Sequence, residues 1–256
     1  MAVKESFRLD GKDVEDNVLF VWSIVAISRA LRFSSEARHK QASSYVLASM
    51  AAYYSIFHLG MFLLYSAPHL MPSRLRSEIK KEMNEGSEDP RKAVRHIDVE
   101  RFLTACSEAN GLSRSVVDLF GKAKSLRVFA NYGPDLQYVP GGSFRVFNRK
   151  HRSEEVCEVI GQLNGIFDDA ITWAATNAPD GISFVSIVLD MAAPYFSPNP
   201  DGDPYYSEWS SPDVLISADN LRRQLEQRAH ELIYPKEAPN TGPQADGYRA
   251  SRGPAA

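Results

Sequence analysis

The chain has 256 residues, a formal net charge of −3 and 44% hydrophobic residues. This length allows one large domain or one domain with appendages, and the weak net charge provides no global attraction to nucleic acid. Any contact with RNA therefore needs a local basic patch. The two cysteines, Cys106 and Cys157, have no CxxC spacing and no neighbouring His cluster. They predict reduced thiols in a cytoplasmic protein, without a metal site, a cofactor or a disulfide.

Helix signals dominate the N-terminal two thirds of the chain. The first helix is expected at 14–38, where apolar residues recur at helical spacing. The second lies in Gln41–Ser73, which contains no Asp, Glu, Lys or Arg. Its centre, at 45–65, is long enough to span a bilayer. We favour a buried core helix and no membrane, because polar residues such as Ser49 and His58 interrupt it; membrane insertion is the alternative.

Four further helices are expected, at 73–85, 92–108, 113–132 and 153–176. A loop with Pro140-Gly141-Gly142 separates the last two. The fold class predicted is all-α, an antiparallel helical bundle over residues 1–177.

The C-terminal third has a weaker pattern. Residues 184–189 fit either a strand or a short helix, and 197–212 fit a loop. A helix at 217–234 completes a helical C-terminal extension, residues 178–234, which is expected to pack on the bundle. Residues 235–256 are rich in Pro, Gly and polar residues, which predicts a disordered tail.

Three separated motifs resemble the HEPN superfamily, the higher-eukaryote and prokaryote nucleotide-binding domain. They are the segment Tyr53-Tyr54-Ser55-Ile56-Phe57-His58, His96 at the start of a later helix, and the segment from Leu126 to Tyr132. The resemblance covers roughly residues 14–175 and implies a HEPN-type bundle. One position departs from the pattern, because Asn131 stands where the family often has Asp, and an amide cannot supply the negative charge of an ion pair.

The resemblance implies two kinds of activity. Many HEPN proteins are metal-independent ribonucleases of toxin or defence type, with Arg and His separated by four to six residues; others only bind RNA, a nucleotide or a protein. This chain has Arg145 and His151 with five residues between them, just before the last bundle helix. His151 would transfer protons and Arg145 would stabilise the phosphorane charge, giving a 2′,3′-cyclic phosphate and a 5′-hydroxyl. Since one His cannot easily make both transfers, a homodimer is expected.

Other interpretations of these residues stay open. The run from Phe144 to Arg152 is strongly basic, so it also fits a non-catalytic patch or a solvated helix start. A second match, Arg32 with His39, lies in the first helix, where the family does not place its motif. Tyr54, His58 and Tyr132 are expected to connect helices by hydrogen bonds. The candidate binding residues are six: His96, Arg127, Asn131, Tyr132, Arg149 and Lys150. The expected partners are RNA or a nucleotide, and an antitoxin-like protein.

Overall fold

The computed structural model describes residues 14–84, 93–132, 136–139, 143–146, 149–196 and 211–233. At 14–16, 83–84, 131–132, 136–139, 143–146, 149–152 and 233 it describes the backbone only. The α-helices are α1 (Val14–Lys40), α2 (Tyr45–Ser66), α3 (Ser73–Asn84), α4 (His96–Ala109), α5 (Arg114–Tyr132), α6 (Arg149–Asn177), α7 (Gly181–Met191) and α9 (Pro212–Ile233). The 3-10 helices η1 (Pro68–Leu70) and η3 (Ala193–Phe196) and the strands β1 (Leu136–Val139) and β2 (Ser143–Val146) complete the described elements. The predicted all-α character is confirmed, apart from one short hairpin.

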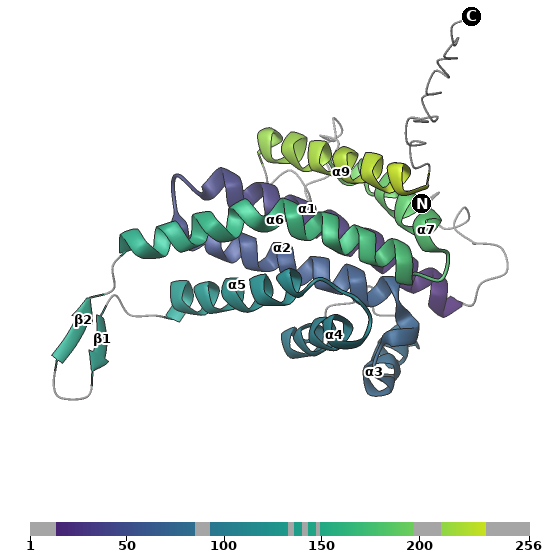
Figure 1. The fold of residues 1–256 in the computed structure, drawn as a ribbon, viewed down its shortest axis with the longest axis horizontal. Coiled ribbons are helices and arrows are strands. Elements are labelled where there is room, and N and C mark those ends of the chain that lie inside the picture. Colours follow the sequence, from purple (N-terminus) through teal and green to yellow (C-terminus); the bar gives the residue numbers. More distant parts are fainter. Residues whose placement is uncertain are drawn as a thin grey trace, which may run out of the picture.

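The charge-free helix α2 is the centre of the core. Every residue from Ala51 to Ala67 except Tyr54 is buried, and α2 packs against α1, α4, α5 and α6. Figure 1 shows α1, α2, α5 and α6 running alongside one another. The helix begins after Ser44, whose hydroxyl accepts a hydrogen bond from the amide of Leu47 at 3.3 Å, and it ends before Pro68. An apolar surface on all sides thus suits a helix that is enclosed by its neighbours.

The polar residues of α2 have partners within the protein. The hydroxyl of Ser55 donates to the carbonyl of Ala30 in α1 at 2.8 Å, and Ser66 donates to the carbonyl of Phe62 at 2.7 Å. Buried hydroxyl groups satisfied in this way are compatible with a tightly packed core.

Two helices, Asn17–Lys40 and Tyr45–Ser66, are long and apolar enough to cross a membrane. Their most apolar windows are 67% and 78% buried within the protein, respectively. Core helices of water-soluble bundles have the same length and composition, so these properties do not assign either helix to a membrane.

The C-terminal helices pack on the bundle. Helix α9 contacts α1, α6 and α7, and α7 contacts α6 and α1 (Figure 1). The segment whose pattern fitted either a strand or a helix forms α7, because Val185, Val188 and Leu189 lie on one buried face at helical spacing. Helix α9 begins earlier than predicted, at Pro212, since proline suits the first turn of a helix, which needs no amide donor.

The largest correction concerns the connection between α5 and α6. Where the sequence pattern predicted a loop up to Ser143, the backbone forms an antiparallel hairpin in which Leu136 faces Val146 and Val139 faces Ser143. The strands flank Pro140-Gly141-Gly142, so the breakers that suggested a loop stand between two short strands. Figure 1 shows this hairpin projecting beyond the end of the bundle. The last bundle helix also starts at Arg149, four residues earlier than predicted.

Candidate functional site

A cluster of aromatic and cationic side chains joins α2, α4 and α5. It consists of Tyr53 and Tyr54 from α2, His96 from the first position of α4, and Arg127 from α5. All four belong to the motifs that suggested the HEPN superfamily. The structure therefore brings together residues that lie up to 74 positions apart in the sequence, as the two ends Tyr53 and Arg127 show. We call these four residues the Tyr–His–Arg cluster.

The hydrogen bond between Tyr53 and His96 is the central contact of the cluster. The hydroxyl oxygen of Tyr53 lies 2.6 Å from Nδ1 of His96. Tyr53 is fully buried, whereas His96 is partly exposed. The sequence pattern had selected Tyr54 as a residue that connects helices, and its hydroxyl does accept a long hydrogen bond from Arg127 of α5. The bond to His96 is made by Tyr53, because the helical turn directs Tyr53 into the core and leaves Tyr54 at its edge.

Local burial and charge determine the protonation of this pair. Burial raises the pKa of Tyr53 to about 12, although Arg127 opposes the shift. Burial also lowers the pKa of His96 below its ordinary value, and the nearby Arg127 and Lys124 lower it further. At neutral pH the pair is therefore an uncharged phenol and an uncharged imidazole. We assign the Tyr53 hydroxyl as the donor to Nδ1, which leaves the ring proton of His96 on Nε2.

The guanidinium of Arg127 lies against the faces of both tyrosines. Its Cζ is 4.9 Å from the ring centroid of Tyr53 and 5.5 Å from that of Tyr54. Nη2 also donates a long hydrogen bond of 3.5 Å to the Tyr54 hydroxyl. Attraction between a cation and aromatic rings stabilises such a position without a carboxylate.

Further aromatic rings support the cluster from the core side. The ring of His96 lies 4.3 Å from that of Phe57, and Phe33 of α1 lies 5.5 Å from Tyr54. His58, expected to connect helices, stacks on Phe33 with ring centroids 5.6 Å apart. Four helices thus contribute to the surroundings of one histidine.

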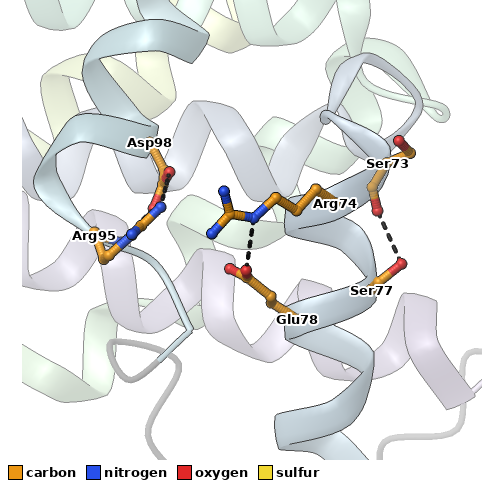
Figure 2. Close-up of polar contacts among 6 residues, drawn as sticks. All are labelled: Ser73, Arg74, Ser77, Glu78, Arg95 and Asp98. Atoms are coloured by element: carbon orange, nitrogen blue, oxygen red, sulfur yellow. Dashed lines mark hydrogen bonds and ion pairs between the residues drawn. The ribbon is translucent and has the colours of Figure 1, made fainter.

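The start of α4, which carries His96, is held by an ion pair (Figure 2). Asp98 accepts hydrogen bonds from the backbone amide of Arg95 at 3.1 Å and from its guanidinium at 2.9 and 3.0 Å. Figure 2 also shows Arg74 of α3 bonded to Glu78 beside this turn. The hydrogen bonds with Arg95 lower the pKa of Asp98, so its carboxylate stays charged at the positive end of the helix dipole.

The other predicted site residues belong to the hairpin and to the helix ends beside it. Arg145 lies in β2 opposite Gln137, and His151 lies in the first turn of α6 with Arg149 and Lys150. Asn131 and Tyr132 close α5. The side chains of these six residues lie outside the described part, so their contacts stay predictions. Arg32 and His39, the second sequence match, both lie within α1.

In the described part of the chain, metal binding and thiol reactivity depend on how the His, Cys, Asp and Glu side chains are placed. No group of three His, Cys, Asp or Glu side chains there is arranged to hold a metal ion. Cys106 and Cys157 are free thiols, and burial raises the pKa of Cys106 to about 12. Cys106 is therefore an unreactive core residue.

Comparisons with known proteins do not identify a family. No protein-family model, no curated protein and no solved structure matches this chain. The likeness to the HEPN superfamily accordingly rests on the sequence motifs alone.

Proposed function

We propose that this protein is a HEPN-like helical module that acts on RNA, as a metal-independent endoribonuclease of toxin or defence type using Arg145 and His151. One observation supports the proposal most. Arg145 lies in β2 and His151 in the first turn of α6, with only residues 147 and 148 between the two elements. An arginine and a histidine, both suited to phosphodiester cleavage, thus lie on the two sides of the short connection between β2 and α6.

The start of α6 is also a favourable place for a phosphate. The first amides of a helix lack partners within the helix and carry the positive end of its dipole. Arg149, Lys150 and His151 occupy this first turn. A phosphate placed there would meet backbone donors and cationic residues together.

The reaction would need two roles from these residues. His151 would accept the proton of a ribose 2′-hydroxyl or donate one to the leaving 5′-oxygen, and Arg145 would stabilise charge on the phosphorane oxygens. One imidazole performs one transfer at a time, so we also propose a homodimer in which two copies face each other. The protein would work in the cytoplasm, with an antitoxin-like protein as a further partner.

Cleavage of a mixed-sequence RNA by the purified chain in excess EDTA tests this function. We expect products with 2′,3′-cyclic phosphate ends from the wild type and none from His151→Ala. Arg114→Ala is the matched control, since it removes an exposed cation at the start of α5, outside the proposed site, and should keep cleavage. A folded wild type that leaves the RNA intact would reject the ribonuclease.

A second candidate function is a binding module without catalysis. It is favoured by the Tyr–His–Arg cluster, which is built from α2, α4 and α5 and contains no residue of the α6 junction. Such a module would hold RNA, a nucleotide or a protein partner even if the junction carries no chemistry.

A further inference from the structure

The positive charge of Arg127 has no carboxylate partner in the described part of the chain. Its guanidinium contacts two tyrosine rings and one tyrosine hydroxyl, and its buried Nε makes no hydrogen bond. Nearby cations differ in this respect. Nζ of Lys124 lies 2.6 Å from Oε2 of Glu100, and Nε of Arg95 lies 2.9 Å from Oδ2 of Asp98. A partly buried cation without a counter-ion keeps its attraction for an anion from outside.

The sequence of α5 gives a reason for the missing partner. At the start of this helix, Arg114 forms an ion pair of 3.0 Å with Asp118, four residues later. Arg127 has the same spacing to residue 131, which is Asn and carries no charge. Side chains four positions apart on a helix are neighbours, so an acidic residue there would be within reach of Arg127. This chain therefore leaves the second arginine of the helix without the acid that the first one has.

His96 adds a second donor beside Arg127. Because Nδ1 accepts the hydroxyl proton of Tyr53, the proton of the imidazole is on Nε2, which makes no hydrogen bond within the described residues. His96, Arg127 and Tyr54 are all partly exposed. Glu100 is the carboxylate whose charge acts on Tyr53, and it is paired with Lys124. Asp98, in the first turn of α4, is paired with Arg95. The cluster thus presents donors to its surroundings, and both of these acids are paired with cations outside it.

We infer that Arg127 and the Nε2–H group of His96 form a phosphate-ester binding site, with the hydroxyl of the partly exposed Tyr54 beside it. A planar guanidinium suits the oxygens of a phosphate, and the imidazole N–H adds a further donor to them. The site shares no residue with the Arg145–His151 pair, and it rests only on the second candidate function, ligand binding by the bundle.

Binding by the full chain, measured by isothermal titration calorimetry, tests this site with three probes. They are inorganic phosphate, adenosine 5′-monophosphate and a short RNA with 2′-O-methyl groups, which cannot be cleaved through its 2′-oxygen. We expect the wild type to bind at least one of the two esters more tightly than inorganic phosphate. The ester that binds more tightly identifies the source of the phosphate as a mononucleotide or an RNA strand.

Two variants should weaken this binding for different reasons. Arg127→Gln removes the cation, and Asn131→Asp supplies the internal carboxylate that competes for it. Each should reduce ester affinity roughly tenfold or more, as expected for the loss of a charged hydrogen-bond partner. Circular dichroism and thermal unfolding verify that both variants are folded.

Matched controls separate this site from simple charge effects and from cleavage. Ser125→Asp makes the same charge change at an exposed position of α5 and should keep ester binding. The 2′-O-methyl RNA keeps the measurement free of cleavage, because it has no free 2′-hydroxyl to attack the phosphate. The inference is overturned if the wild type binds neither ester, or if folded Asn131→Asp binds as tightly as the wild type.

Discussion

At the scale of single residues, the Tyr53–His96 hydrogen bond determines the chemistry of the cluster. The bond needs an uncharged imidazole, because only the neutral ring has a lone pair on Nδ1 to accept the phenol proton. Burial and the charges of Arg127 and Lys124 favour this neutral form by lowering the pKa of His96. Burial, Arg127 and Lys124 all oppose protonation of His96, so protonation at low pH should weaken the cluster.

We expect His96 to make folding less stable as the pH falls through the range between its ordinary pKa, about 6.5, and its lowered folded value. In this range the unfolded chain binds a proton that the folded chain does not, so the free energy of unfolding decreases with decreasing pH. Urea unfolding at several pH values between 7.5 and 5 measures the effect. His96→Gln, which keeps an acceptor for Tyr53, should show a weaker pH dependence.

An NMR titration of the imidazole gives an independent measurement. The midpoint of His96 should lie below its ordinary value of 6.5, because burial and the charges of Arg127 and Lys124 lower its pKa. Equal pH dependence of unfolding in the wild type and His96→Gln would contradict the role of this side chain.

At the scale of elements, the close approach of α2 and α4 holds His96 beside Tyr53. Gly60 permits this approach. A Cβ atom at position 60 would lie 2.5 Å from Cγ1 of Val99 and 3.3 Å from Cδ1 of Leu103, both on α4. Two helices can pack this closely where one of them has no side chain at the contact.

Gly60→Ala should therefore destabilise the protein, although alanine favours helices by about 1 kcal/mol relative to glycine. Forcing an extra methyl group into a packed core costs about 1–3 kcal/mol, which exceeds that gain. Chemical denaturation measures the free energy of unfolding. In a Val99→Ala background, where the methyl has room, the same change should raise stability. A stabilising Gly60→Ala in the wild type would refute this account of the contact.

At the scale of the whole molecule, the C-terminal helix α9 is part of the same hydrophobic core as the bundle. Its buried residues include Ala218, Leu221, Leu225 and Ala229, and they belong to one cluster with the residues of α1 and α6. Arg222 is also buried, and it bonds to Asp219, Glu226 and the carbonyl of Leu189 in α7. These contacts attach α9 to α7 by polar as well as apolar interactions.

Deletion of residues 212–256 should consequently abolish cooperative unfolding or cause aggregation. Exposing several large apolar side chains costs about 1.5–3 kcal/mol each, and their sum is comparable with the whole stability of a typical domain. Deletion of 235–256 is the control, because it keeps every described contact and should leave the unfolding midpoint unchanged. Differential scanning calorimetry compares the two. Cooperative unfolding of the shorter chain at the wild-type temperature would show that the bundle is independent of α9.

The sequence by itself determined the helical class and most helix positions, because amphipathic spacing, proline breaks and the charge-free segment are local signals. Through a resemblance it also predicted His96 and Arg127 as binding residues, and the structure places both side chains in one cluster. It missed the hairpin, since strands of four residues between turn residues have too short a pattern to distinguish from a loop.

Only the tertiary structure decided which tyrosine bonds to His96 and that Arg127 has no acidic partner among the described residues. Both facts depend on how α2, α4 and α5 pack. Contacts between different helices produce no periodic pattern in the sequence of any single helix. The close approach at Gly60 also depends on packing between helices. The sequence shows only a single glycine in a helix, whereas the structure shows that Val99 leaves no room for a side chain there. Local patterns determine elements, whereas the chemistry of this site arises from long-range packing.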